Sequence, residues 1–381
     1  MSAASPAPAL QVEWRELSAL AGIAEEWRGL AARAIEQNVF YEPAFALAAA
    51  PVFGADVGAV LVRSSAGRQL GLFPSRIERW RGGPWAMTVG WTHAFAPLGT
   101  PLVDRDEALP VIAAWLDHLS RDSSMPALLL LPLLPEHGAF AEALGTVLTR
   151  SGRNSAAFGE HQRALLEPGA GREGYIDRAI PARRRKELRR QRRRLEDIAP
   201  VTLDTARQAP DVAVALKDFL ALEASGWKGS AGTAAANDAA IRVFIETGVA
   251  ALAAAGQARI DRLMLDGRAI VTAITLSSGA TAWFWKIAYD EDFAHCSPGV
   301  QLAIDLTERL LADRTIERVD SCATADHPMI DHLWRERLAL SDWLIELRPT
   351  IMPFKFACQI ETMRRAAIAA AKAIRDRMSR N

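Results

Sequence analysis

Hydrophobic and polar positions along the chain follow two spacings, one typical of helices and the other of strands. Apolar residues three or four positions apart predict helices over residues 17–35 and 138–152. Two strands joined by a Ser-Ser-Ala-Gly turn are predicted within residues 57–80, and the apolar run 127–135 predicts a buried strand. The first half of the chain therefore mixes both kinds of element.

The second half contains the same kinds of element in a clearer order. Two helices precede three strands with tight turns, and a helix, a strand, a helix and a final strand follow. A three-strand meander followed by a crossover helix predicts an α/β (α+β) fold, with a mixed, mostly antiparallel sheet flanked by helices in each half. In order, these predicted elements span residues 210–227, 239–256, 257–265, 269–278, 281–288, 297–311, 316–321, 329–338 and 341–349.

This alternation of elements predicts two domains and three smaller regions. We expect a disordered lead over residues 1–11, a first domain over 12–165, a basic linker helix region over 166–199, a second domain over 200–348 and a basic C-terminal helix over 349–381. Similarity between the two halves is weak at the level of sequence.

Composition limits the classes of partner. Lys plus Arg and Asp plus Glu number 45 each, so no net charge attracts nucleic acid or a membrane surface. Three scattered cysteines and seven histidines show no metal-ligand spacing, so we expect no metal. The N-terminus lacks the features of a signal peptide, and the apolar run 126–135 is shorter than the roughly 20 residues of a membrane span. We expect a soluble, cytoplasmic protein without a transmembrane segment.

The junction between the third strand of the meander and the next helix reads Ser297-Pro298-Gly299. Ser is a favoured N-cap, Pro suits the first helical position, and Gly lets a ligand approach the backbone. Backbone N–H groups of Gly299, Val300 and Gln301, at the positive end of the helix, would then form an anion site. Many helices that bind nothing start in the same way, so the motif alone leaves both interpretations open.

The strand that precedes this junction is rich in aromatic residues. Strict alternation predicts that Trp283, Trp285 and Ile287 share one face of the sheet. Phe284 and Lys286 would then share the other face. The anion site would lie directly after this strand, beside the crevice at the strand end.

Residues 181–198 predict a helix of a different character. Nine Lys or Arg residues and one Glu lie between Arg183 and Arg194, and the apolar stripe is limited to Leu188 and Leu195. No aromatic residue lies between the cations, so the charge of a nucleic-acid site is present without its stacking residues. A solvated linker helix, or one that contacts the phosphates of a bound ligand or of lipids, is the simpler interpretation.

From about Trp14 to Leu347 the chain resembles the GNAT acetyltransferase superfamily, specifically in the second half and faintly in the first. The likeness is closest to the two-domain CelD-like branch of cellulose biosynthesis clusters, and it extends to FemAB-type aminoacyltransferases. The residues that carry it are the basic helix and the segments KIAYDEDFAHCSPGVQL (286–302), LEASGWKG (222–229) and RVDSCATADHPM (318–329).

The resemblance implies tandem GNAT-like domains and an acyl-CoA donor, with acetyl-CoA the expected one. The pyrophosphate would lie on the helix that opens at Ser297, and the pantetheine arm would pair with the strand at Lys286 and Ile287. Typical GNAT enzymes carry Gln/Arg-x-x-Gly-x-Gly/Ala at this place. Alignment on Gly299 puts Cys296 at the first position and Gln301 at the last, which leaves the identity of the donor open.

Acyl transfer to an amine needs a general base, a stabilised oxyanion and a proton for the leaving thiolate. Asp320 ends a strand beside the expected crevice and is one candidate base, although a strand-end Asp also commonly caps the next turn. Glu223, near a helix end, is the other candidate base, although it could instead form an ordinary ion pair in solvent. Tyr289 directly follows the cofactor strand and is the third candidate for catalysis.

Four further residues are candidates for contact with the acceptor. Trp227 could wall a pocket, although core packing is the usual role of a Trp. Lys228 directly follows the predicted helix 210–227, and Asp290 follows the predicted strand 281–288. His327 is a solitary His, and such a residue usually has a structural role. Cys296 and Cys322 lie near the expected site, but nothing pairs either with a base, so covalent catalysis is not supported.

These observations favour an N-acyltransferase that moves an acyl group from acyl-CoA to an amine. By resemblance alone, the acceptor would be a small molecule or saccharide of polysaccharide or envelope metabolism. One alternative is an aminoacyltransferase that uses charged tRNA. A second is a catalytically silent GNAT-like scaffold that binds a nucleotide or a partner protein.

Overall fold

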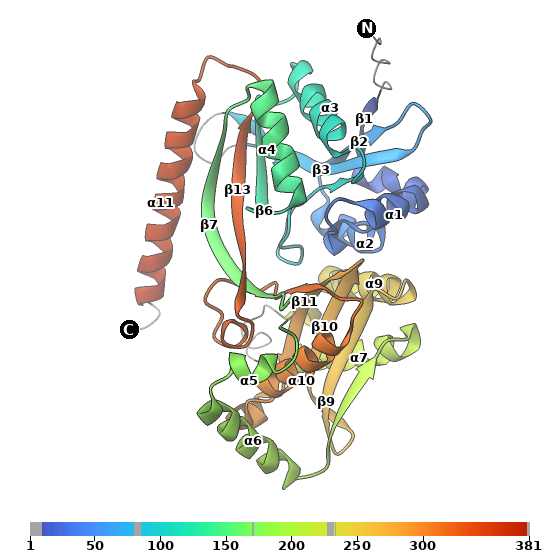
Figure 1. Cartoon of the computed structure of the whole chain (residues 1–381), viewed down its shortest axis with the longest axis vertical. Coiled ribbons are helices and arrows are strands. Elements are labelled where there is room, and N and C mark those ends of the chain that lie inside the picture. The colour runs from blue at the N-terminus through green and yellow to red at the C-terminus, as the bar shows by residue number, and fades with distance from the viewer. Residues whose placement is uncertain (1–9, 80–84, 170, 227–231, 233, 379–381) are drawn as a thin grey trace. The chain divides into compact units, whose positions relative to one another are not determined.

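Figure 1 shows the computed structural model, which describes residues 10–79, 85–169, 171–226, 232 and 234–378. The chain forms two compact units that are discontinuous in sequence. Unit 1 comprises residues up to Asn38, Gly54–His161 and the chain from Ala339 onward; unit 2 comprises Val39–Phe53 and Gln162–Leu338. The domain boundaries expected from the sequence stay a prediction.

Unit 1 is a sheet with helices on its faces. Its strands follow the order β1-β2-β3-β4-β6-β13-β7, β5 pairs with β3, and β4 with β6 is a parallel pair among mostly antiparallel ones. The strands are β1 (Gln11–Glu16), β2 (Val57–Arg63), β3 (Gln69–Arg79), β4 (Ala86–Gly90), β5 (Leu102–Val103), β6 (Leu128–Pro135), β7 (Ser155–Leu166) and β13 (Glu336–Glu346). The α-helices are α1 (Ala24–Arg33), α3 (Ala108–Arg121), α4 (Ala139–Ser151) and α11 (Phe354–Met378), with a 3-10 helix, η1, at Leu17–Ile23.

The strands of unit 2 follow a similar plan. Its strands follow the order β7-β12-β11-β10-β9-β8, because β7 continues into it, and β11 with β12 is a parallel pair. The strands of its own are β8 (Val201–Ala206), β9 (Ala258–Leu265), β10 (Arg268–Ser278), β11 (Thr281–Tyr289) and β12 (Arg318–Asp320). The α-helices are α2 (Pro43–Phe53), α5 (Tyr175–Ala179), α6 (Ala182–Glu196), α7 (Ala209–Ser225), α9 (Ala239–Ala254) and α10 (Pro298–Ala312). Short 3-10 helices are η2 (Val39–Tyr41), η3 (Ala235–Asn237), η4 (Glu291–Cys296) and η5 (Ile330–His332).

These elements confirm the predicted fold class, a mixed, mostly antiparallel α/β arrangement flanked by helices. Helix α4 also ends as expected, with Gly152 in the left-handed region at φ 64°. The predicted helix over 329–338 is wrong. Ile330, Leu333 and Trp334 have helical spacing and are buried, but a single 3-10 turn buries them before β13 begins at Glu336.

The predicted alternation along β11 is correct for Trp283, Phe284 and Trp285 but wrong beyond them. The register of β10 and β11 shifts between Ile274, which lies opposite Lys286, and Thr275, which lies opposite Phe284, so β11 has a bulge at Trp285. A bulge of this kind reverses the side chains beyond it. Phe284 packs in the core beside α10, and Ile287 joins the same core instead of lying with Trp283.

The other face of β11 packs against Val39–Phe53, a segment from the first half of the chain that belongs to unit 2. Phe45 of α2 makes edge-to-face contacts with Phe244 of α9 and Trp285 of β11, at ring-centre distances of 5.3 and 5.6 Å. Phe40 packs in the same way on Trp283, at 5.9 Å. Aromatic pairs of this geometry stabilise a core beyond their buried area, which explains why Val39–Phe53 belongs to unit 2.

Helix α11 packs on unit 1 by its first turns alone. Ala357 is buried in a small cluster with Leu128 and Leu344, and Arg365 forms an ion pair with Asp342 of β13 at 2.7 Å. From residue 366 to residue 374 the helix is exposed on all sides. Within the described ranges, no helix has both the length and the apolarity that crossing a bilayer requires.

Candidate active site

Helix α10 begins at the Ser-Pro-Gly junction, but not in the predicted way. Ser297 lies in the left-handed region, at φ 51° and ψ 50°, and its side chain makes no cap hydrogen bond. Its backbone carbonyl instead accepts hydrogen bonds from the N–H groups of Val300, at 3.1 Å, and Gln301, at 3.2 Å. The expected side-chain cap and the expected free N–H groups of Val300 and Gln301 are therefore wrong.

One backbone donor remains at this helix end. Pro298 has no N–H, and the N–H of Gly299 has no hydrogen-bond partner in the described part of the chain. The first turn of α10 carries no acidic residue. A single N–H donor at the positive end of a 15-residue helix therefore stands ready for an anion.

Gly299 is not required for the fold. A Cβ built there would lie 3.7 Å from Ile287 Cδ1, 3.7 Å from Tyr289 Cδ1 and 3.8 Å from Met329 Sδ, which are ordinary contacts. The residue is nevertheless buried against the end of β11. Packing and backbone geometry would accept Ala, so neither explains the glycine.

The edge of β11 opens beside this position. Strand β12 pairs with β11 at Thr281, Ala282 and Trp283 only, whereas β11 continues to Tyr289. Beyond Trp283, β11 pairs with β10 on its other side. Among the described residues, no strand pairs with the β12 side of β11 beyond Trp283. Such an edge offers N–H and C=O groups to an extended ligand, and the half-buried Ile287 lies on it. Lys286, also half-buried, precedes Ile287 and has its ammonium group over the Trp285 ring.

Glu223 and Tyr289, 66 positions apart, line one small pocket of about 40 Å³, together with Leu222, Gly226, Ile287, Ala288 and Glu291. Glu223 is buried on α7, and its Oε2 accepts a hydrogen bond from the Ala235 N–H at 3.0 Å. Tyr289 is half-buried at the end of β11. The structure thus brings together two of the three predicted catalytic residues and one predicted cofactor residue.

Asp320 lies elsewhere and is engaged. It is buried at the end of β12 and forms an ion pair with the buried Arg163 of β7, and its Oδ1 accepts a hydrogen bond from the Cys322 N–H at 2.9 Å. These contacts are those of a residue that caps a turn and neutralises a buried cation. Arg163 is not among the residues predicted from the sequence; its signal there is a charged residue directly before the apolar run Ala164–Leu166.

The other predicted residues hold local structure. Asp290 caps η4 by accepting from the Asp292 N–H at 3.1 Å, and it forms an ion pair with Arg268. Gln301 donates to the Cys296 carbonyl at 2.7 Å. His327 Nδ1 accepts a hydrogen bond from the Met329 N–H at 3.3 Å. Burial lowers the pKa of His327, and this effect outweighs the charge of Asp331, which acts to raise it. Trp227 and Lys228 lie outside the described residues.

The cysteines near the site are protonated thiols. Burial raises the pKa of Cys296, and burial together with the charge of Asp320 raises that of Cys322 well above its usual range. A thiol with a raised pKa is a poor nucleophile. Among the described residues, no group of three or more His, Cys, Asp or Glu could hold a metal ion.

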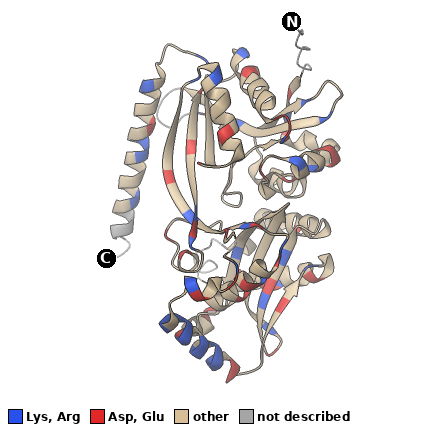
Figure 2. Cartoon of the chain, viewed as in Figure 1, with Lys and Arg blue, Asp and Glu red and all other residues tan. Residues whose placement is uncertain are grey.

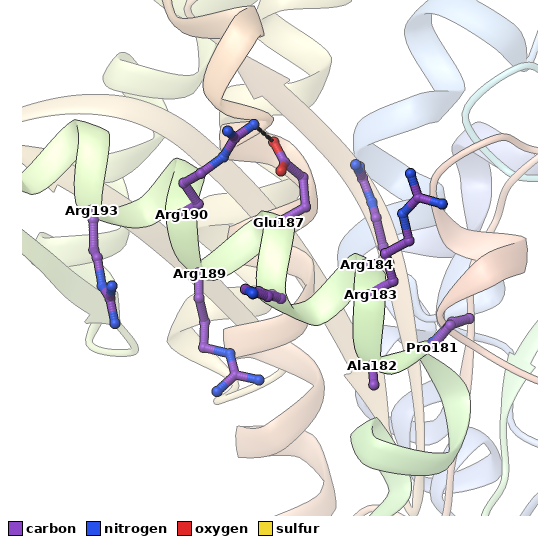
Figure 3. Close-up of a pocket in the computed structure, with 9 residues that line it drawn as sticks. Pro181, Ala182, Arg183, Arg184, Glu187, Arg189, Arg190 and Arg193 are labelled. Atoms are coloured by element: carbon purple, nitrogen blue, oxygen red, sulfur yellow. Dashed lines mark hydrogen bonds and ion pairs between the residues drawn. The ribbon is translucent and has the colours of Figure 1, made fainter.

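The basic helix α6 turns its cations outward. Leu188, Gln191 and Leu195 are buried, while Arg183, Arg189 and Arg193 are exposed. Figure 2 shows the concentration of positive charge on this helix, and Figure 3 shows Arg190 turned towards Glu187, its ion-pair partner at 2.8 Å. Pro181, Ala182, Arg184 and Lys186 complete the open groove between these side chains. The geometry suits phosphate oxygens more than an apolar ligand.

Residues 182–327 match a family model described as an acetyltransferase (GNAT) domain. The matched segment includes α6, β11, α10 and every predicted site residue. The match supports the GNAT resemblance for this part of the chain, and the CelD-like branch stays a prediction. No curated protein sequence matches the chain.

Three solved structures share the fold at 10% sequence identity. A conserved protein of unknown function from Bacteroides thetaiotaomicron has a TM-score of 0.54, over 89% of this chain and 100% of that one. The C-terminal domain of a putative lysylphosphatidylglycerol synthetase from Agrobacterium fabrum has 0.53, over 91% and 96%. FemX has 0.54, over 84% and 95%. At this identity the likeness concerns the fold alone.

Proposed function

Because residues 182–327 match a GNAT domain, we propose that the chain is an N-acyltransferase that moves an acyl group from acyl-CoA to an amine. The observation that carries the proposal is the open edge of β11, which meets the start of α10 at Gly299. The pantetheine amides would pair with β11 at Lys286 and Ile287, and a phosphate would face the Gly299 N–H. The bound thioester supplies the activated acyl carbon.

Glu223 and Tyr289 fit two roles in that reaction. The Glu223 carboxylate, in the pocket beside the open edge, would accept the proton of the attacking amine. The Tyr289 hydroxyl, at the end of the same strand, would donate a proton to the thiolate as the C–S bond breaks. The proposal assigns Asp320 no such role, because Arg163 already neutralises its charge.

The test is calorimetric titration with acetyl-CoA and longer acyl-CoAs of wild type and Gly299→Glu. The new carboxylate would oppose the phosphates at the helix end, so we expect affinity to fall at least tenfold, or about 1.4 kcal/mol. The melting temperature should also fall, because Gly299 is buried, so affinities are compared at a temperature where both proteins are folded. The control is Gly145→Glu in α4, where an added Cβ meets nothing within 4 Å.

Equal acetyl-CoA affinity in wild type and a folded Gly299→Glu protein would contradict the proposed site. Absence of binding of any acyl-CoA to wild type would contradict acyl-CoA as the donor. An amine acceptor on a saccharide is the expected substrate class, and it follows from the resemblance alone.

A second candidate is an aminoacyltransferase that uses charged tRNA, favoured by the exposed cations of α6. FemX and a protein named as a lysylphosphatidylglycerol synthetase share the fold. The test replaces Arg183, Arg189, Arg190 and Arg193 with Gln. These side chains are exposed, so the fold should persist, and any affinity for charged tRNA should fall with a weaker dependence on salt. Acyl-CoA affinity retained in this variant, with no tRNA binding in wild type, excludes the second candidate.

A further inference from the structure

Unit 1 contains a cavity that the acyltransferase proposal does not use. It measures about 590 Å³, within the range of pockets that bind small organic molecules. It lies at the end of the sheet where Val57, Ser75 and Thr88 of three neighbouring strands come together. Trp14, Glu16, Asp56, Arg76 and Met125 also line it.

The strand register explains why the cavity forms there. Trp14 lies opposite Val60, and Thr88 lies opposite Leu129, and both Val60 and Leu129 belong to the core that packs under α3 and α4. The cavity therefore occupies the same face as that core. Helix α3 ends at Arg121, before Met125 reaches the cavity, so the helices leave this end of the face uncovered.

One wall of the cavity is an indole ring laid on backbone. A Cβ at Gly58 of β2 would lie 2.1 Å from Cζ2 of Trp14, so only glycine lets the ring rest on the strand. Trp14 nevertheless stays 44% exposed. A large aromatic face fixed in a cavity and left open to solvent is suited to a ligand.

The floor of the cavity carries a hydroxyl group that the fold does not use. Thr88 is 2% exposed, and its Oγ1 is buried and has no hydrogen-bond partner among the described residues. A buried hydroxyl without a partner destabilises the fold. Valine has nearly the same shape and avoids this cost, so a bound molecule is a physical reason for the threonine.

The rim of the cavity is negative. Glu16 and Asp56 are exposed, and neither forms an ion pair within the described ranges, whereas Glu13 on the same strand as Glu16 pairs with Arg15 and Arg63. Among the described residues, the lining contains one cation, Arg76, which forms an ion pair with Glu78 at 2.5 Å. The site therefore combines unneutralised carboxylates, an exposed indole face and a hydroxyl.

We propose that this cavity binds a small organic ammonium compound, primary or quaternary, that also carries a hydroxyl group. The ammonium group would lie at the Trp14 face and near the rim carboxylates, because cations are attracted to both. A hydroxyl of the ligand would reach Thr88 Oγ1. This site is independent of the acyl-CoA site, and neither proposal rests on the other.

The experiment is calorimetric titration of the full chain with choline and with glucosamine, and with glucose as the neutral counterpart. We expect saturable binding of at least one ammonium probe with a Kd of about 1 mM or lower, and none of glucose. Trp14→Ala and the double variant Glu16→Gln/Asp56→Asn should each weaken binding about tenfold or more. Acetyl-CoA affinity should stay unchanged in both.

Three outcomes of this titration overturn the proposal. One is the absence of binding by both ammonium probes; another is binding that Trp14→Ala leaves unchanged. Equal binding of glucose and glucosamine also overturns it, since the ammonium group would then contribute nothing.

Thr88→Val tests the floor of the cavity. It should raise the melting temperature, because an unpaired buried hydroxyl is removed, and should lower the affinity for the bound probe several-fold. The matched control is Thr272→Val in β10, where a hydroxyl is also buried without a partner among the described residues but lines no part of this cavity. It should raise the melting temperature alone. Unchanged probe affinity in Thr88→Val contradicts the assigned role of this hydroxyl.

Discussion

Both units pass from an antiparallel meander through a crossover helix to a parallel strand, but the two helices begin in opposite electrostatic surroundings. In unit 1, Asp104, Asp106 and Glu107 directly precede or cap α3. In unit 2, the four residues that precede α10, 294–297, include no acidic residue, and neither helix has one in its first turn. Negative charge at a helix N-terminus repels a second anion. The comparison therefore predicts a phosphate site in unit 2 and none in unit 1.

The strands before the two helices differ as well. Strand β4 ends one residue after its parallel pairing with β6, at Thr88 and Val89. Strand β11 continues for six residues after its last pair with β12, at Trp283. A ligand that extends along a strand thus has an edge to pair with in unit 2 only. The same order of strands and helix forms a site for an acyl donor only where the start of the helix lacks negative charge and the strand extends beyond its parallel partner.

The largest expected effect concerns the buried Asp–Arg pairs of the two units. The side chains of Asp320 and Arg163 in unit 2 are both under 5% exposed, whereas Asp104 in unit 1 pairs with Arg33, which is 36% exposed. Asp320→Ala leaves Arg163 buried without this counter-charge and should cost about 3–5 kcal/mol. Asp104→Ala should cost less, roughly 1–3 kcal/mol, because Arg33 can be hydrated.

Urea unfolding, followed by circular dichroism, gives the free energy of unfolding of both variants and of wild type. A stable Asp320→Ala protein that has lost its activity would instead identify Asp320 as the general base and contradict the role given to Glu223.

Glu223→Gln should abolish most of the activity with little change in stability. Loss of a general base lowers kcat by about 10²–10⁴-fold, while the amide keeps the acceptor for the Ala235 N–H. Thiol release from acetyl-CoA, with an amine that wild type acylates, gives the rate. Glu291→Gln, an exposed carboxylate on the same pocket, is the control and should change kcat little. Equal losses in the two variants would deny Glu223 a specific role.

Ser297→Asp gives α10 the acidic start that α3 already has. Aspartate tolerates the left-handed conformation of Ser297 and suits a helix N-terminus, so the melting temperature should stay or rise. Acetyl-CoA affinity should fall about tenfold, or 1.4 kcal/mol. Ser297→Asn has the same shape without the charge and should keep most of the affinity. An equal loss in both variants would show that shape, and not charge, decides binding.

The smallest effect is a difference in acid sensitivity. Burial, together with the charge of Arg76, lowers the pKa of His93 in unit 1 to about 3, whereas the unfolded chain titrates near 6.5. Between these values the unfolded state alone binds the proton, so this contribution to stability is complete above about pH 6.5 and is lost as the pH falls towards 3. His93→Gln should reduce the fall in melting temperature between about pH 7 and pH 4.5. An unchanged fall would place the acid sensitivity elsewhere.

The sequence predicts the fold better than the site, because helices and strands depend on neighbouring residues, whereas the site depends on contacts between distant segments. The meander, the crossover helix and the basic helix follow from periodicity, which depends on near neighbours. The bulge at Trp285 does not, since it depends on how β10 and β11 pair, and it moves Ile287 to the face of Phe284. The contribution of Val39–Phe53 to unit 2 is likewise a matter of long-range packing.

The candidate site shows the same limit. The motif at Ser297-Pro298-Gly299 correctly marks a helix start, but the left-handed turn at Ser297 consumes two of the three N–H groups expected there. The proximity of Glu223 and Tyr289, and the ion pair that engages Asp320, depend on contacts between distant segments. Residue type and spacing could name these residues as candidates but could not rank them.

The most direct test of the central claim is hydrogen exchange of the wild-type chain with and without acetyl-CoA, read by peptide. Unit 2 should gain protection over residues 284–301, which hold the open edge of β11 and the start of α10. The counterpart in unit 1, residues 86–112, should show no change. Protection over 86–112, or none over 284–301 at saturating acetyl-CoA, would contradict the account.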